Sequence, residues 1–328
     1  TNADVVSCDI SYTGCVNTVF PSNLILRRPL EPNSNLSFFI YGVPDQSSCR
    51  LAGEEVVWKR FTNFNDLTKI QKNANNLTKL LTTGWDGGAI SLNKVSNNGY
   101  LEFIASEINK SRMVGLSASY GSSSYTTIQF AVYLQSNAAF GVYESGTNRG
   151  NFGTYVSGDV FKVAIESGVV KYYKNGTLFY TSLVTPSLPQ YVNASLNDVG
   201  ATVTNAMVYN YNTGSFMASA FQAGKNVTYT WMVNGVVMQS GINPAYNNSL
   251  LNLNDIITCQ LTLGGCLSAY SYLSNYIIIK AAPQQTADFF IEGSPVLPGC
   301  KMAIEQVKWK LSDLISNLTV VNTNSLIR

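Results

Sequence analysis

The sequence predicts an all-β protein in which two kinds of β-sandwich alternate in tandem repeat, and three observations support this. Short segments rich in aromatic and β-branched residues recur along the chain, separated by clusters of Gly, Asn and Ser. No stretch shows the sustained apolar period of an amphipathic helix. Two segments far apart in the chain are nearly the same, which indicates an internal repeat.

Residues 35–209 are expected to form the larger sandwich. The clearest strands are 100–106, 127–135, 159–167 and 169–182. The last of these contains Asn175-Gly176 between two apolar-polar runs, which predicts a hairpin because a type I′ turn needs positive φ at both positions. A segment of this length suffices for a two-sheet core.

Residues 210–282 form a second, smaller unit in the sequence. A strand with Trp231 runs into an Asn234-Gly235 turn, and a later strand ends in Cys259. A tryptophan strand followed by a cysteine strand is the immunoglobulin-like pattern. The earlier strand at 215–221 has no cysteine, so we expect apolar packing around Trp231, and no inter-sheet disulfide, to hold this Ig-like sandwich.

The internal repeat is carried by "CRLAGEEVVWK" at 49–59 and "CKMAIEQVKWK" at 300–310, which share six of eleven residues. At the same spacing of 251 residues, "LSFFIYG" at 36–42 matches "ADFFIEG" at 287–293. We interpret the chain as a window on a longer tandem array. Residues 1–28 would then end a preceding Ig-like module, 29–34 would be a connector, and 283–328 would begin the next large sandwich.

The cysteines also follow the repeat, since Cys8 matches Cys259 and Cys15 matches Cys266. Cys259 and Cys266 flank a Gly-Gly turn, so we predict a hairpin disulfide there and another between Cys8 and Cys15. This leaves Cys49 and Cys300, which could pair elsewhere, stay buried and reduced, or link one module to the next. The sequence does not choose among these connectivities.

Charge and composition exclude several functions. Charged residues make up only 12% of the chain, and the net charge is +2 without a basic cluster. We therefore expect no nucleic-acid partner, because the chain lacks the cationic cluster that would displace counterions from a phosphate backbone. No apolar run approaches the roughly 18 residues of a membrane span.

The chain contains no histidine, which excludes Ser-His-Asp triads, His-ligated zinc and imidazole bases. A glycosidase would need two carboxylates facing one site. Glu102 and Glu107 are five residues apart, which places them on opposite faces of a strand. We therefore expect no enzymatic activity.

Two groups of motifs resemble a known family. "YTWMVNGVVMQSG" with "LLNLNDIITCQLTLGGC" resembles the Ig-like repeats of very long surface proteins from Bacteroidota. "TGWDGGA" with "GTYVSGDVFKVAIESGVVKYYKNGTLFYTS" is similar to the concanavalin-like (lectin-like) modules found between those repeats. The resemblance implies a secreted, cell-surface filament or adhesin exported by the type IX system, as gliding-motility adhesins are.

Carbohydrate binding is the one ligand function that the residues favour. Trp85 lies beside Asp86 in a glycine-rich loop, and Tyr120 and Tyr125 lie in a second polar loop, where flat rings could stack on sugars. Asp86 could accept from hydroxyl groups or bind Ca²⁺, the only cofactor considered. The alternative is that Trp85 plugs the end of the sandwich and that Asp86-Gly87 is an ordinary turn.

Two functional hypotheses follow: a structural filament segment, or an adhesive unit in which a weak glycan site gains avidity by repetition. Partners would be surface glycans or neighbouring filament chains. Two further alternatives stay open, a fimbrial subunit that exchanges strands between chains and a carbohydrate-binding module of a larger secreted enzyme.

Overall fold

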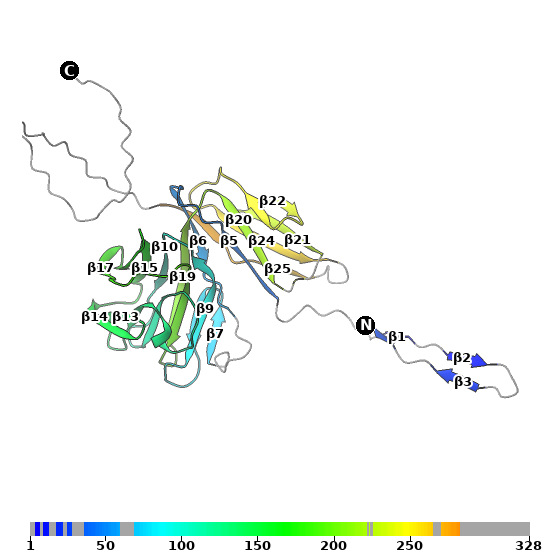
Figure 1. Cartoon of the computed structure of the whole chain (residues 1–328), viewed down its shortest axis with the longest axis horizontal. Helices are drawn as coiled ribbons and strands as arrows, with labels where there is room; N and C mark the ends of the chain where they lie inside the picture. Colours follow the sequence, from blue (N-terminus) through cyan, green and yellow to red (C-terminus); the bar gives the residue numbers. More distant parts are fainter. Residues whose placement is uncertain are drawn as a thin grey trace, which may run out of the picture. The chain divides into compact units, whose positions relative to one another are not determined.

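The computed structural model describes residues 36–59, 69–221, 223, 226–264 and 270–282, and the backbone of four short strands before residue 28. This part of the chain is almost entirely β-structure (Figure 1), which confirms the all-β prediction. Its helical content is one 3-10 turn, η2 (Tyr125–Thr127). Across these residues no helix has the length and apolar character that crossing a bilayer requires.

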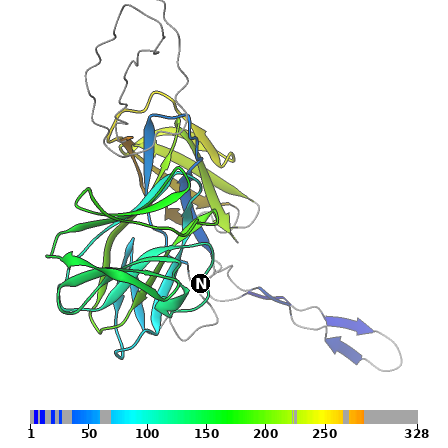
Figure 2. The ribbon, with the colours of Figure 1, turned by 60° about the vertical axis from the view of Figure 1, so that its left-hand side comes forward.

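The large sandwich has two layers, visible in green and cyan in Figure 2. The first is part of a longer sheet and runs in the order β17 (Thr177–Thr181), β16 (Val169–Lys174), β15 (Val160–Glu166), β10 (Gly99–Ile104), β19 (Thr202–Tyr211), β6 (Arg50–Glu55). Two short strands extend it through β19: β8 (Asn76–Lys79) and β7 (Ile70–Asn73).

The second layer is a separate six-stranded sheet. Its order is β14 (Thr147–Thr154), β13 (Ala139–Glu144), β12 (Phe130–Leu134), β11 (Arg112–Ser117), β18 (Gln190–Leu196), β9 (Gly87–Val95). Alternate residues of both layers face each other because successive side chains point to opposite faces of a strand. The facing core includes Phe103, Phe161, Phe130, Val132 and Leu134, all at most 1% exposed.

The predicted strands and turns are found where the sequence places them. β16 and β17 form the hairpin expected at 169–182, and its turn residues Asn175 and Gly176 have φ values of 49° and 80°. Asn234 and Gly235, at 51° and 79°, form the second predicted turn. Positive φ at both positions is what a type I′ turn requires.

The small sandwich packs two sheets around Trp231. One runs β23 (Ala245–Asn247), β20 (Ser215–Phe221), β5 (Ser37–Gly42), and the other runs β26 (Ile277–Ala281), β24 (Ile256–Leu263), β21 (Val227–Val233), β22 (Val236–Gly241), with β25 (Ser271–Leu273) beside β24. Trp231 is fully buried and its ring stacks on Tyr246 at 5.5 Å. The expected core role of Trp231 is therefore confirmed.

β6 joins the two sandwiches. It pairs on one edge with β19 of the large sandwich and on the other with β26 of the small one. β5 precedes β6 in the chain but pairs with β20 of the small sandwich. The boundary expected at residue 35 assigned β5 to the large sandwich, whereas its hydrogen bonds assign it to the small one. The large sandwich is thus inserted between strands of the small sandwich.

Cys259 carries a free thiol buried among the apolar side chains of the small sandwich. The burial raises the pKa of this thiol to about 12, which keeps it protonated. Ser274 lies opposite Cys259, donating to its carbonyl at 2.9 Å and accepting from its N–H at 2.9 Å. Because its thiol is free, Cys259 does not form the predicted hairpin bridge to Cys266. Cys266 itself, and both Cys8 and Cys15 of the other predicted bridge, lie outside the described residues. Cys49 is free and exposed.

Before residue 28 the backbone repeats the strand pairing of residues 256–281. β1 (Asp4–Val6) pairs with β4 (Ile25–Arg27), as β24 pairs with β26. β2 (Asp9–Tyr12) pairs with β3 (Thr18–Pro21), as β24 pairs with β25. After the 251-residue shift, both registers agree within one residue.

Glu54 is a carboxyl group buried where the two sandwiches meet, with 1% of its surface exposed. It accepts from the Gly42 N–H of β5 at 2.9 Å and from the Asn93 amide of β9 at 3.2 Å. Burial outweighs these two hydrogen bonds and raises the pKa of Glu54 to about 8. The group is therefore mainly neutral at pH 7 and ties β5 to the large sandwich without a buried charge.

This pKa predicts a pH-dependent stability. Between the ordinary carboxyl pKa of 4.5 and about 8, Glu54 holds a proton in the folded chain that it loses in the unfolded chain. The free energy of unfolding should therefore fall as pH rises through this range, by on the order of 5 kcal/mol. Urea denaturation between pH 5 and 8.5 should show this slope in the parent chain and a flatter profile in Glu54→Gln. Glu166→Gln, on a half-exposed side chain, serves as control; equal slopes in all three would contradict the assignment.

Candidate functional site

Four partly buried rings, Trp85, Tyr125, Tyr133 and Tyr143, form an aromatic cluster on the outer face of the six-stranded sheet. The Trp85 ring lies 4.9 Å from Tyr125 and 5.6 Å from Tyr133, between centroids. Tyr143 lies 5.9 Å from Tyr125 and 5.4 Å from Tyr133 in edge-to-face contacts. Edge-to-face ring contacts stabilise a fold by more than the burial of apolar area alone provides.

Strand geometry brings two of these rings to the outer face. Tyr133 of β12 lies between core residues Val132 and Leu134, so its side chain points away from the core. Tyr143 of β13 follows the same alternation after Val142. The diagonal offset of Tyr133 and Tyr143 across the β12–β13 pair lets their rings meet.

The other two rings come from loops that pack on this face. The segment 118–128 is held by hydrogen bonds from Ser195 Oγ to the Ser123 carbonyl, 2.6 Å, and from Thr127 Oγ1 to the Ser122 carbonyl, 3.1 Å. Tyr125 of this loop is one of the four cluster rings, which pack against a small buried group formed by Met113, Ile128 and Ala131. The cluster therefore also anchors the 118–128 loop.

The polar atom of Trp85 is satisfied within the protein. With the Asn197 amide oriented to suit both of its neighbours, its oxygen accepts from Trp85 Nε1 at 3.1 Å and its nitrogen donates to Asp198 at 2.8 Å. Partial burial is the main cause that raises the pKa of Tyr143, and the electrostatic effects of Tyr133 and Tyr125 raise it further. The cluster thus consists of one indole and three phenol rings.

Asp86, beside Trp85, is neutralised by two lysines. Lys69 and Lys79 each donate to one oxygen of its carboxylate. Partial burial alone would raise the pKa of Asp86, but the hydrogen bonds and charges of the two lysines lower it. Ca²⁺ prefers several free oxygen ligands, and both oxygens here face ammonium groups. No group of three or more His, Cys, Asp or Glu side chains that could hold a metal lies within the described residues. This geometry does not fit the calcium role expected for Asp86.

Two predicted binding residues, Trp85 and Tyr125, are in contact although forty residues separate them. Asp86 lies next to Trp85 but is engaged by lysines, and Tyr120 lies partly buried in the 118–128 loop. Sequence reasoning missed Tyr133 and Tyr143. Both occupy outward-facing positions of strands in which apolar and polar residues alternate. This pattern did not single them out, because tyrosine suits either face of a sheet.

The two acids considered for hydrolysis lie in different environments. Glu102 is on the outer face of β10, and burial raises its pKa while the charges of Lys162 and Lys280 oppose the rise. Glu107 lies beyond the end of β10, where it pairs with Arg112 at 3.3 Å and accepts from Thr202 Oγ1 at 2.6 Å. Glu102 thus lies on β10, whereas Glu107 lies after the strand has ended. The lack of enzymatic activity stays a prediction.

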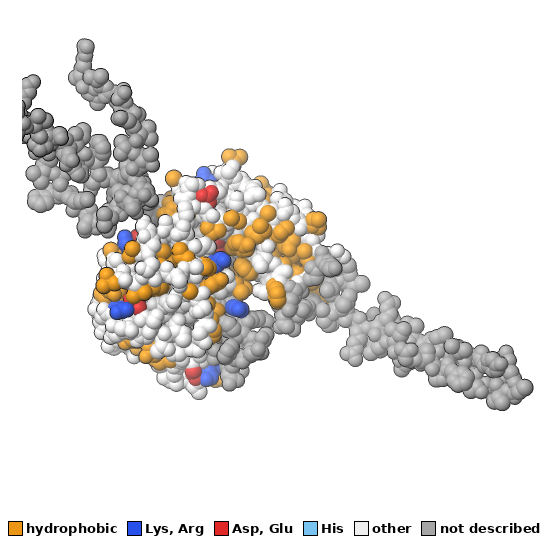
Figure 3. Space-filling model, in the orientation of Figure 1, with side chains coloured by type: hydrophobic (Ala, Val, Ile, Leu, Met, Phe, Trp, Pro, Cys, Tyr) orange, Lys and Arg blue, Asp and Glu red, His pale blue; other side chains and the backbone are white. Residues whose placement is uncertain are grey.

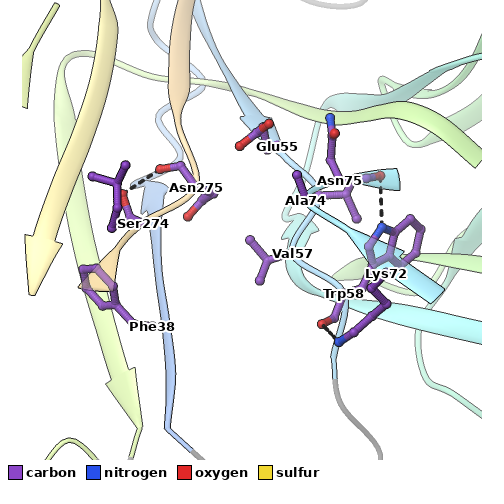
Figure 4. Close-up of a pocket in the computed structure, with 11 residues that line it drawn as sticks. Phe38, Glu55, Val57, Trp58, Lys72, Ala74, Asn75, Ser274 and Asn275 are labelled. Carbon is purple, nitrogen blue, oxygen red and sulfur yellow. Dashed lines mark hydrogen bonds between the residues drawn. The ribbon is translucent and has the colours of Figure 1, made fainter. Parts of the chain in front are cut away.

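A shallow cleft of about 290 Å³ lies where β5 and the β25–β26 connection meet the segment after β6 (Figure 4). Phe38 and Asn275 line it on one side, and Glu55, Val57 and Asn75 line it on the other. Asn275 is bonded to the β5 backbone, and Glu55 accepts from the Tyr276 N–H at 3.2 Å. The polar groups of this cleft serve the joint between the sandwiches.

The face drawn in Figure 3 carries little charge. The face in Figure 3 shows isolated charged side chains of both signs among neutral and hydrophobic ones, with no basic patch. A neutral polar surface agrees with the low charge of the whole sequence.

No family model matches the chain, and no curated protein matches it. Among solved structures it is similar to the PSpry domain of TRIM65, with TM-score 0.36 and 15% identity over 46% of this chain and 88% of that chain. It is also similar to the Bacillus licheniformis β-glucanase, with TM-score 0.31 and 12% identity over 53% and 97%. The carbohydrate recognition domain of Emp46p gives 0.33 and 8% over 44% and 86%. Values this low carry no argument about function.

The lysine pair predicts the behaviour of Asp86. Lys79 is fully buried, so Asp86→Ala leaves its ammonium without a carboxylate and should lower the free energy of unfolding by about 2–3 kcal/mol. Lys69→Ala is the control and should cost under about 1 kcal/mol, because Lys69 is 27% exposed. Added Ca²⁺ should leave the Tm of the parent chain unchanged. Saturable calcium binding that Asp86→Ala abolishes would overturn this assignment.

Proposed function

We propose that this chain is a segment of a long extracellular repeat protein, in which the paired sandwiches act as a stiff spacer of a cell-surface filament or adhesin. The observation that carries the proposal is the pairing of β6 with strands of both sandwiches. Arg50, Ala52 and Glu54 each lie in register with a residue on β26, and β19 covers the opposite edge. A hydrogen-bonded sheet bends far less than a flexible linker.

The recurring strand pairing supports the repeat. The backbone before residue 28 reproduces the pairing of β24 with β25 and β26, at the offset that also relates 49–59 to 300–310. An array of such units would alternate stiff two-sandwich bodies with the Pro-bearing connectors at 27–35 and 280–286. Secretion by the type IX system and a role in gliding motility rest on the family resemblance alone.

Stiff coupling predicts that both sandwiches unfold together. In the parent chain, hydrogen exchange at the amides of β12, in the large sandwich, and of β21, in the small one, should report the same denaturation midpoint. Ala52→Pro, which breaks the strand that both share, should lower the free energy of unfolding by about 3 kcal/mol or more and separate the two midpoints. Val237→Pro on edge strand β22 is the matched control and should leave the midpoints coincident. Separate midpoints in the parent chain would refute the stiff spacer.

Carbohydrate binding at the aromatic cluster is a second candidate function. It is favoured by one observation: four neutral rings with hydroxyl or indole groups remain partly exposed together on one sheet face. In a repeat protein even a weak site of this kind would gain avidity from its copies.

A glycan array probed with the full chain tests this candidate. Saturable binding should fall about tenfold or more in Trp85→Ala, which removes the largest of the four rings. Tyr173→Ala, on the outer face of the other sheet, is the control and should bind as the parent does. If the parent binds no glycan, or both variants bind equally, the aromatic cluster is only a support for the 118–128 loop and the spacer function stands alone.

A further inference from the structure

We propose that β5 and β26 form a mechanical clamp that carries tension along the chain. β5 is the strand through which the chain enters the small sandwich at residue 37, and β26 is the strand through which it leaves at residue 281. Any pull on the chain is therefore applied to these two strands. The inference rests on the proposed filament function only for the source of the load.

The register fixes how the load acts. Ile40 of β5 is bonded to Asn275, and Gly42 is bonded to Glu54, which lies opposite Ile277. Moving along the chain from Ile40 to Gly42 on β5 therefore follows the same direction as moving from Asn275 to Ile277 at the start of β26. β5 and β26 run roughly parallel, so the chain enters at one end of the small sandwich and leaves at the other.

Tension therefore drives the two strands past each other lengthwise. Hydrogen bonds between strands lie perpendicular to the strand axis. A lengthwise pull loads the bonds of β5 to β20, and those of β26 to β6 and β24, together rather than one after another. Forced unfolding then requires several bonds to break at once, which slows it.

The Asn275 side chain latches the open edge of β5. Its Oδ1 accepts from the Ile40 N–H at 2.8 Å, and its Nδ2 donates to the Ile40 carbonyl at 3.0 Å. On β20, Ala218 lies directly opposite Ile40, but its N–H donates to the Pro244 carbonyl on the side away from β5. Ile40 and Ala218 are therefore a pair that exchanges no hydrogen bonds. Ile40 is fully buried, and buried backbone groups need partners. The amide of Asn275 therefore replaces a missing strand.

Two further features close the clamp. The Gly42 N–H, on the same open edge, is held by the buried Glu54 carboxyl. Ile40, Ala52, Ile277 and Ile279 share one apolar cluster between the two strands. Displacing β5 would break the hydrogen bonds of Ile40 and Gly42 and expose this cluster together.

The residues of the clamp recur in the sequence. Ser274-Asn275 precedes β26, and Ser22-Asn23 precedes β4. Gly293 and Glu305 match Gly42 and Glu54 at the spacing of 251 residues. The latching amide thus has a sequence counterpart before residue 28, at a spacing of 252, and Gly42 and Glu54 have counterparts after residue 282, in the next repeat.

Force spectroscopy on the full chain, held at its two termini, tests the clamp. Asn275→Ala removes both bonds to Ile40 and should speed unfolding at constant force about tenfold. Asn275→Asp keeps the acceptor for the Ile40 N–H but sets a carboxylate oxygen against the Ile40 carbonyl, so it should also speed unfolding at pH 7. It also serves as the informative variant if Asn275→Ala does not fold.

Asn234→Gly is the matched control. Asn234 also makes two side-chain hydrogen bonds, to Asp255 and from Ile256, but at the β21–β22 turn rather than between the strands that the pull reaches. Glycine tolerates its φ of 51°. Its unfolding rate under force should change less than about twofold, even if its chemical stability falls as much as that of Asn275→Ala.

The clamp is refuted if Asn275→Ala and Asn234→Gly unfold equally fast under force, or if Asn275→Ala unfolds as slowly as the parent chain. Either result leaves the stiff spacer intact, because that proposal is judged by coincident unfolding without force. Conversely, separate unfolding midpoints with a strong effect of Asn275→Ala would retain the clamp and remove the stiff spacer.

Discussion

The structure depends on β6, a six-residue strand with hydrogen-bonded partners on both edges. Ala52 of this strand belongs to the core of the small sandwich, whereas Val56 and Trp58, directly after it, belong to the core of the large one. The two cores therefore meet along one continuous segment of chain. Neither sandwich can separate from the other without exposing backbone hydrogen bonds of β6 to water.

The acid at this joint shows how a polar group can be kept there. Glu54 is buried, yet it bonds to β5 through Gly42 and to the large sandwich through Asn93. A charged carboxylate in this place would be costly, and the raised pKa means that the neutral form is the one buried. A hydrophobic residue would fill the space but leave the Gly42 N–H without a partner. The carboxyl group thus aligns β5 as well as packing against it.

Local features of the fold could be predicted from the sequence, and long-range ones could not. Alternation and Asn-Gly dipeptides placed the strands around Asn175-Gly176 and Asn234-Gly235, because those signals act within a few residues. The partners of β5 and β6 lie more than 150 residues away, and no periodicity encodes them. Trp85 and Tyr125 were found through loop composition, whereas Tyr133 and Tyr143 were hidden because strand tyrosines suit core and surface equally. The lysines that neutralise Asp86 lie just before β7 and at the end of β8, and no sequence signal pointed to them.

The insertion of the large sandwich has a consequence for folding and for load. β5 and β6 precede the large sandwich, and the strands that complete the small sandwich follow it, so closing the small core requires a very long loop to be ordered. Once the large sandwich is folded, it holds β6 in place beside β19 and brings the later strands close to β5. The large sandwich thus acts as the template for the small one. In return, the small sandwich takes the pull at β5 and β26, where the chain enters and leaves it. Tension passes to the large sandwich through β6 and through the 212–214 connection between β19 and β20. The division explains why the latch, the buried acid and the apolar cluster are gathered between β5, β6 and β26.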